Sequence, residues 1–310
     1  MLLRQFMSAR HPSVKRTGRK TSLGHICRGA VTTMSSSWLP HSRSVGTFIA
    51  QLLGYVALST ALEYGWYHRR FSERRRWRTQ PSNDARSLEA STATGGYDWG
   101  VPARDLGSAP RRGRHELHAQ YATVNLVVSA LFAGATCEAY LRGWTNLFER
   151  GGVLEVGVGL AKLVVVQSVL EYYWHRVMHF PFFYRRMHKT HHHYKSPAVW
   201  DDLFIDPREA FGYYCILYGT SFVVSAPVLS FLLYMAVMGT CGVLDHCGIS
   251  FGLELSLLLP STKLEVYGTS FHDLHHAKFN ANYAFPFAAM DVFHGTRIAA
   301  AVEAPKGKAS

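Results

Sequence analysis

The chain has 310 residues, of which 48% are hydrophobic and only 17% are charged, with a formal net charge of +12. A soluble globular domain usually carries about 25% charged residues, so this composition argues against an ordinary soluble domain. The positive charge would suit nucleic acid, but the basic residues flank apolar segments and show no RNA- or DNA-binding fingerprint. Basic flanks beside membrane spans are the simpler interpretation, and we expect no nucleic-acid partner.

The N-terminal segment 1–45 contains eight Lys/Arg, many Ser/Thr and no acidic residue. This composition resembles an organellar transit peptide. A disordered basic tail and an alternative start at Met34 also fit, and the sequence does not choose among the three.

Long apolar runs predict the membrane spans. The run within 46–66 is about long enough for one crossing, and a second covers 121–141. A third, 152–174, contains Glu155 and Lys162, so we expect it to pack against neighbouring helices.

The last apolar run, 211–244, is longer than one crossing. Pro227 lies near its middle and predicts a helical hairpin that enters the membrane and returns.

Residues 67–120 carry 11 Arg between Arg69 and Arg114 and read as an exposed cytoplasmic loop. The second and third spans then return the chain to that side near Glu171, and the hairpin returns it again near Asp245. We therefore expect an all-α, multi-span membrane bundle with a histidine-rich di-metal centre on the cytoplasmic side. The basic tail would lie across the membrane, which fits the charge rule only if the tail is removed.

Histidines cluster at those two places in a repeated pattern. An H-x-x-x-H motif is followed by one H-x-x-H-H motif, and a second H-x-x-H-H motif comes after the hairpin. With 17 histidines in 310 residues, roughly 0.05 such triplets are expected by chance, so two copies need another explanation. The eight residues are His175, His179, His188, His191, His192, His272, His275 and His276.

Eight clustered imidazoles in an apolar protein are costly without a strong partner, and a metal is that partner. They are too many for one zinc ion and suit two metals with four or five ligands each. Imidazole binds iron, copper, nickel and zinc, so the ligand type alone does not select the metal. Asp245 and Asp273, each beside a candidate ligand, could orient imidazole N–H groups, or could cap helices or face solvent.

The remaining histidines carry less information. Six are expected to be surface or satisfied core residues: His11, His25, His41, His68, His115 and His118. His193 and His294 stay ambiguous. The cysteines Cys27, Cys137, Cys215, Cys241 and Cys247 are odd in number and unpatterned, which indicates small core residues and no disulfide framework.

Two blocks resemble a known family. "YYWHRVMHFPFFYRRMHKTHHHYKSP" and "FHDLHHAKFNANYAFPFAAMDVFHGT" are similar to the histidine boxes of the fatty acid hydroxylase superfamily, which includes sterol desaturases, 4-methylsterol oxidases, cholesterol 25-hydroxylases and fatty acid 2-hydroxylases. The resemblance runs from about Val124 to Thr296. We therefore expect a domain over 121–296 and a C-terminal tail over 297–310.

The resemblance implies a membrane di-iron enzyme that uses dioxygen and receives electrons from NAD(P)H through cytochrome b5 and a reductase. It makes the eight boxed histidines iron ligands and catalytic residues. His246, in "DHCG", resembles a further element of the sterol oxidases and is expected to be a ninth metal ligand.

The implied substrate is a lipid, with a sterol favoured and the endoplasmic reticulum as the location. The third box looks more like 4-methylsterol oxidases and cholesterol 25-hydroxylases than sterol C-5 desaturases. The alternative functions are a sterol C-5 desaturase, a fatty acid or sphingolipid hydroxylase, and a non-enzymatic metal-binding protein. The alternative location is a plastid or mitochondrial membrane. The sequence departs from the family pattern at Phe271, Asp206 and His294, and these differences bear on which lipid is the substrate. The Arg-rich segment and "RRMHK" either dock an acidic electron carrier or only set the topology.

Overall fold

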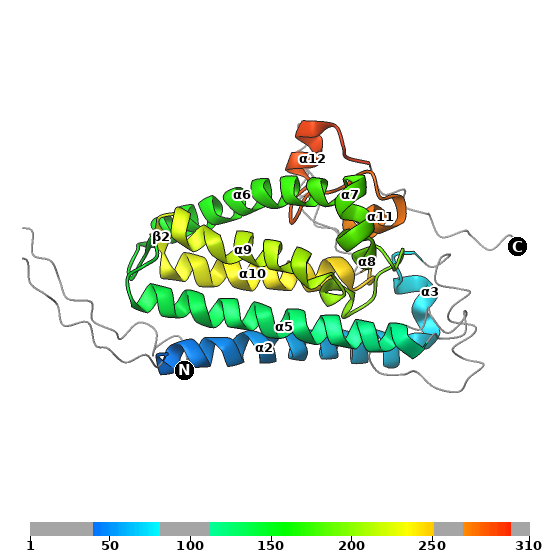
Figure 1. Ribbon diagram of the computed structural model, residues 1–310, viewed down its shortest axis with the longest axis horizontal. Coiled ribbons are helices and arrows are strands. Elements are labelled where there is room, and N and C mark those ends of the chain that lie inside the picture. The colour runs from blue at the N-terminus through cyan, green and yellow to red at the C-terminus, as the bar shows by residue number, and fades with distance from the viewer. Residues whose placement is uncertain (1–39, 81–111, 251–268, 299–310) are drawn as a thin grey trace, which may run out of the picture.

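The computed structural model describes residues 40–80, 112–250 and 269–298. Its long helices lie side by side in a bundle (Figure 1), as the sequence predicts. Within the described residues, the helices long and apolar enough to cross a membrane are Ser42–His68, His118–Leu141, Val153–Met178 and Val228–His246. These four apolar helices indicate an integral membrane protein.

The first span is α2 (Ser42–Leu62), which continues as a π-helical stretch, η1 (Glu63–His68). Two short turns follow, η2 (Phe71–Glu73) and α3 (Arg74–Trp77). The side chains of Arg69, Arg70 and Arg76 are exposed, as expected of this segment. Trp77 and Arg78 are only 7% and 4% exposed, so the expected exposure does not hold at these two positions. Residues 81–111 of that loop lie outside the described part of the chain.

The second helix, α5 (Arg112–Leu141), packs along α2 (Figure 1). It begins nine residues before the apolar run, because its polar first turns extend beyond the apolar part. The third, α6 (Val153–Met178), buries Leu163 against its neighbours. Its charged residues Glu155 and Lys162 lie on the exposed side of the helix.

The predicted hairpin is present as α9 (Pro207–Val223) and α10 (Val228–His246). Asp206 begins α9, since its carboxylate accepts a hydrogen bond from the Arg208 backbone N–H at 3.0 Å. The turn between the helices contains β2 (Ala226–Pro227), which pairs in parallel with β1 (Leu147–Phe148). Pro227 lies between the two helices: α9 ends at Val223, and Pro227 is the N-cap residue of α10.

The main core lies between α5, α6, α9 and α10. Its largest fully buried members include Leu163, Tyr218 and Tyr234.

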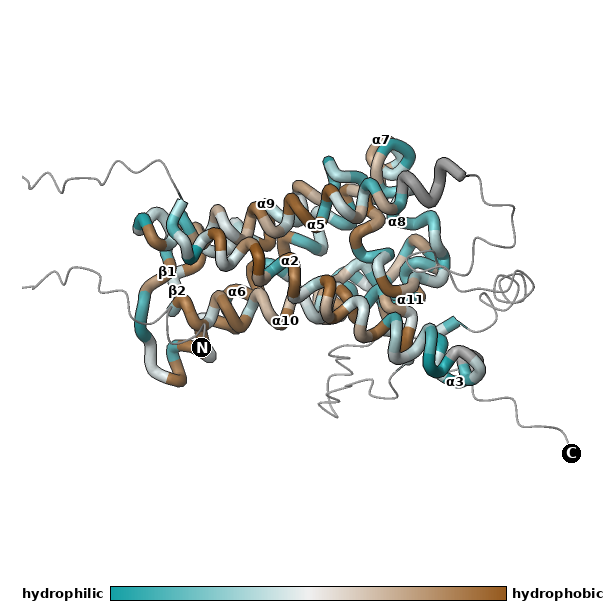
Figure 2. The backbone as a smooth tube through the Cα atoms, turned by 90° about the horizontal axis from the view of Figure 1, so that it is seen from below, coloured by the Kyte–Doolittle hydropathy of each residue, from teal (hydrophilic) through white to brown (hydrophobic). Residues whose placement is uncertain are grey.

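Short elements collect at one end of the bundle, on the right in Figure 1, where α2 and α6 end and α9 begins. Figure 2 shows apolar residues along the long helices and many hydrophilic residues in these short elements. Both histidine-rich segments and the basic segment after α2 therefore share one end of the molecule. The elements are α7 (Pro181–Phe183), η4 (Tyr184–His188), α8 (Lys189–His191), η5 (Asp201–Leu203), α11 (Thr269–Lys278) and α12 (Ala289–His294).

Candidate metal centre

The nine histidines expected as ligands come together in two adjacent groups at the end of the bundle. In each group, one candidate ligand atom per residue lies within 4.8 Å of all the others. The first group has five members, His175, His179, His188, His192 and His275, and the second has four, His191, His246, His272 and His276. This division matches the expected two sites with four or five imidazoles each.

Helical spacing explains how each H-x-x-H-H motif supplies both groups. His188 and His192 are four residues apart and share the first group, while His191 between them enters the second. The later motif is the complement: His272 and His276 enter the second group, and His275 enters the first. Each motif therefore supplies two histidines to one group and one histidine to the other.

Ring nitrogens within each group are close together. In the first group, His188 Nε2 lies 2.9 Å from His179 Nε2 and 3.0 Å from His192 Nε2, and His192 Nε2 lies 3.1 Å from His275 Nε2. In the second, His246 Nε2 lies 3.1 Å from His191 Nε2 and 2.9 Å from His272 Nε2. Two imidazole nitrogens bound at right angles to one ion, each about 2.0–2.1 Å away, would be about 3 Å apart. The spacing therefore fits nitrogens that converge on a shared ion.

Several Nδ1 atoms face away from the groups and meet acceptors. His175 Nδ1 lies 2.8 Å from the Tyr283 carbonyl, and His275 Nδ1 lies 2.6 Å from the Ala281 carbonyl. His276 Nδ1 lies 3.1 Å from the carbonyl oxygen of Tyr194. An Nδ1–H that donates to a carbonyl leaves Nε2 unprotonated, which is the tautomer a metal requires.

The buried imidazoles are held in the neutral form. Burial lowers the pKa of His179 to about 2. Burial is also the main cause that lowers the pKa values of His188, His191, His192, His272, His275 and His276. The Nε2 atoms of His175 and His276 are buried and have no hydrogen-bond partner among the described residues, as expected of atoms that a metal would satisfy.

Two acidic residues that sequence reasoning missed contact candidate ligands. Glu209 Oε1 lies 2.5 Å from His188 Nδ1, and both side chains are fully buried. Asp202 Oδ1 lies 3.4 Å from His246 Nδ1. Glu209 is the third residue of α9, so its sequence context suggested only a helix start. An orienting role for Asp245 and Asp273 stays a prediction.

The other histidines lie outside both groups. His118 is buried and pairs with Asp201 at 3.3 Å, while His41 is exposed and pairs with Glu138 at 2.9 Å. His294, ambiguous from sequence, stacks on Tyr172 with ring centroids 5.0 Å apart. His193 is exposed. His11 and His25 lie outside the described residues, as does the side chain of His115.

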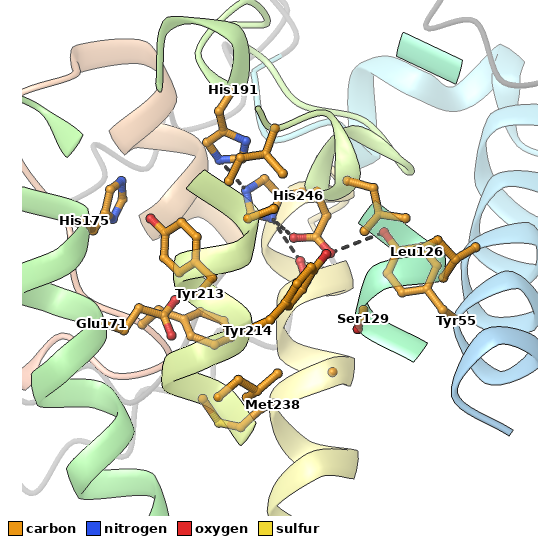
Figure 3. Close-up of a pocket in the computed structure, with 18 of the residues that line it drawn as sticks. Tyr55, Leu126, Ser129, Glu171, His175, His191, Tyr213, Tyr214, Met238 and His246 are labelled. Carbon is orange, nitrogen blue, oxygen red and sulfur yellow. Dashed lines mark hydrogen bonds and ion pairs between the residues drawn. The ribbon is translucent and has the colours of Figure 1, made fainter. Parts of the chain in front are cut away.

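A cavity leads from the histidines into the bundle between α2, α5, α6, α9 and α10. His175, His191, His246 and His272 line one end of it, so it reaches both groups. Apolar side chains such as Leu126, Leu217 and Met238 line much of the rest. Figure 3 shows His191 and His246 above, with Met238 at the opposite end of the view.

Comparison with known proteins agrees with the geometry. The model of the fatty acid hydroxylase family matches residues 160–296, which include all nine histidines. This part of the chain is therefore similar to the fatty acid hydroxylase family. No solved structure matches the chain significantly.

Among curated proteins, the chain is 30% identical over 138 residues to human "Fatty acid hydroxylase domain-containing protein 2" (44% of this chain, 38% of that protein). It is 31% identical over 167 residues to the "Cholesterol 25-hydroxylase-like protein" of Danio rerio (51% and 62%). It is 28% identical over 147 residues to "Methylsterol monooxygenase 2-2" of Arabidopsis thaliana (46% and 53%). The chain thus spans between 38% and 62% of the length of these relatives, whose names indicate oxidoreductases.

Proposed function

We propose that the protein is a membrane-bound oxidoreductase that uses dioxygen and two iron ions to oxidise a C–H bond of a lipid, with a sterol as the favoured substrate. The observation that carries this proposal is the pair of histidine groups at the head of a cavity lined largely by apolar side chains, within a bundle of membrane-length helices. The family match and the relatives' hydroxylase and monooxygenase names support the reaction class.

The nine histidines would hold the metal pair, five on one ion and four on the other. Iron bound there supplies the activation of dioxygen that oxidation of an unactivated C–H bond needs. The protein's own contribution is positional. Carbonyls and Glu209 orient the imidazoles, and the cavity would hold a lipid next to both groups.

Electrons would come from NAD(P)H through cytochrome b5, or a similar carrier, with its reductase. The basic residues at the histidine end, including the exposed Arg185, Arg186 and Lys189, suit an acidic carrier that approaches from the cytosol. We place the protein in the endoplasmic reticulum membrane with this end facing the cytosol.

The test is expression in a yeast strain that lacks its own 4-methylsterol oxidase, beside a His191→Ala/His275→Ala variant that damages both groups. Mass spectrometry of sterols and fatty acids should show loss of 4,4-dimethylsterols with the wild-type chain alone. If those sterols do not change but a new hydroxylated or unsaturated lipid forms, and is absent with the variant, the proposed oxidation stands and the substrate is a different lipid.

Metal analysis of the purified protein separates this proposal from a zinc or copper hydrolase and from a non-enzymatic metal-binding protein. We expect close to two iron ions per chain. A single zinc ion, or iron without any lipid product, would contradict the proposal.

A further inference from the structure

The cavity below the histidines contains an acidic side chain that the metal site does not use. Glu171 lies on α6 and lines the cavity together with Gln167 (Figure 3). A carboxylate inside a membrane-length helix is costly and usually marks a functional position.

A hydrogen-bond network fixes the orientation of Gln167. The Tyr234 hydroxyl lies 3.1 Å from Gln167 Oε1 and 3.0 Å from the Leu217 carbonyl oxygen, and both Tyr234 and Gln167 are almost completely buried. Because the Gln167 oxygen faces Tyr234, its NH2 group faces Glu171 and donates to one carboxylate oxygen. Within the described part of the chain, this is the hydrogen bond that Glu171 makes. Its second oxygen is left for a ligand in the cavity.

The other carboxylate in the cavity belongs to Asp202. One of its oxygens accepts a hydrogen bond from the Tyr55 hydroxyl at 3.2 Å. The other lies 3.4 Å from His246 Nδ1, which meets the Gly242 carbonyl at 3.0 Å. Asp202 therefore lies against a candidate metal ligand, whereas Glu171 has Gln167 as its hydrogen-bond partner among the described residues.

Glu171 also lies close to the metal-binding groups. It precedes His175 by four residues on the same helix, so the two side chains share a face and are about 6 Å apart along the axis. A lipid group bonded to Glu171 therefore lies near the histidines, and so do the carbons next to that group.

We propose that Glu171, positioned by Gln167, accepts a hydrogen bond from a hydroxyl of the lipid substrate and so presents a C–H bond close to that hydroxyl to the metal pair. This inference rests on the proposed function and narrows its substrate class. Lipids whose oxidised carbon lies close to a hydroxyl fit the cavity. A sterol oxidised at the end of its side chain, far from its hydroxyl, does not.

The test uses the full-length, iron-loaded protein and two probes, a 4,4-dimethyl-3-hydroxysterol and its 3-O-methyl ether, which cannot donate a hydrogen bond. Competition against the radiolabelled alcohol measures binding, and product formation measures turnover. We expect the wild-type chain to bind the alcohol about 2- to 10-fold more tightly than the ether, the usual effect of one hydrogen bond.

Glu171→Leu should bring the alcohol-to-ether ratio close to one, and Glu171→Gln should give an intermediate ratio. Glu155→Gln, on the exposed side of the same helix, should keep the wild-type ratio. The iron content of every variant reports whether the metal centre has formed.

Equal binding of alcohol and ether to the wild-type chain, no binding of the alcohol, or an unchanged ratio in iron-loaded Glu171→Leu would overturn the inference. The first and last results leave the proposed function intact if lipid is still oxidised. An iron-loaded wild-type chain that oxidises no lipid would overturn the function itself.

Discussion

Single side chains around the histidines set their protonation and direction, and Glu209 is the clearest case. Its carboxylate meets His188 Nδ1 at 2.5 Å, in a position with no exposure to solvent. A buried carboxyl group is costly without a partner, and the imidazole of His188 supplies that partner.

We predict that Glu209→Ala lowers metal affinity about 10- to 100-fold, because His188 loses the acceptor that orients its ring. Iron retained after dialysis against graded chelator measures the effect. Arg208→Ala, which removes a neighbouring exposed side chain, should retain wild-type iron. If both variants lose iron equally, Glu209 has no specific orienting role.

The buried histidines also predict how the metal-free chain responds to pH. The pKa of His179 is about 2 in the folded chain, against an ordinary value of about 6.5 when unfolded. Below pH 6.5 the unfolded chain therefore binds more protons than the folded chain. The free energy of unfolding is therefore highest, with respect to His179, above pH 6.5, and it falls progressively as the pH drops below that value.

Thermal unfolding in detergent at pH 7.5, 6.5, 5.5 and 5.0 tests this prediction before most carboxylates titrate. The midpoint should fall across the series. A midpoint that stays constant or rises between pH 7.5 and 5.0 would show that the imidazoles are solvated instead of buried.

At the scale of elements, two glycines on α9 differ in the space available for a side chain. A Cβ at Gly212 would lie 2.2 Å from the Trp174 ring on α6, one residue before His175. A Cβ at Gly219 would meet nothing within 4 Å. Only Gly212 is required for close contact between α6 and α9.

Gly212→Ala should therefore destabilise the protein by about 1–3 kcal/mol through overpacking. Gly219→Ala should be neutral or stabilise it by about 0.5–1 kcal/mol, because alanine favours a helix. Unfolding midpoints in the same detergent compare the two. Similar midpoints would mean that α6 and α9 do not pack as closely as described.

At the scale of the whole molecule, Arg78 joins segments far apart in the sequence. Its guanidinium donates to the Tyr67 hydroxyl, to Ser196 Oγ at 2.7 Å and to the Pro197 carbonyl at 3.0 Å. Gly248 packs against it with φ +63°, where a Cβ would lie 2.0 Å from Arg78 Nη1. The segment that follows the first span is thereby connected to two other segments, the one after His191 and the one after His246.

We predict that Arg78→Ala costs about 1–3 kcal/mol, because it leaves buried hydroxyl and carbonyl groups without a donor, and that it also lowers iron content. Arg70→Ala removes an exposed guanidinium from the same segment and should change neither quantity appreciably. Unfolding midpoints and metal analysis of both variants provide the comparison. Retention of stability and iron in Arg78→Ala would show that the first span is independent of the metal centre.

Local sequence patterns were sufficient to predict many features of this molecule. Apolar length predicted the helices, and Pro227 predicted the hairpin. Histidine spacing predicted eight residues that do come together, and the family resemblance added His246. These features depend on residues a few positions apart, where helical periodicity and side-chain chemistry act directly. They could therefore be read without knowledge of the fold.

Contacts between distant segments could not be read in this way. The division of the histidines into five and four, the pairing of Glu209 with His188, the burial of Arg78 and the position of Glu171 in the cavity all depend on how the helices pack. Arg78 was expected in an exposed loop because it lies in a segment rich in Arg, Gly, Pro and Ser. Only the assembled bundle supplies the carbonyls, hydroxyls and neighbouring rings that make such a burial favourable.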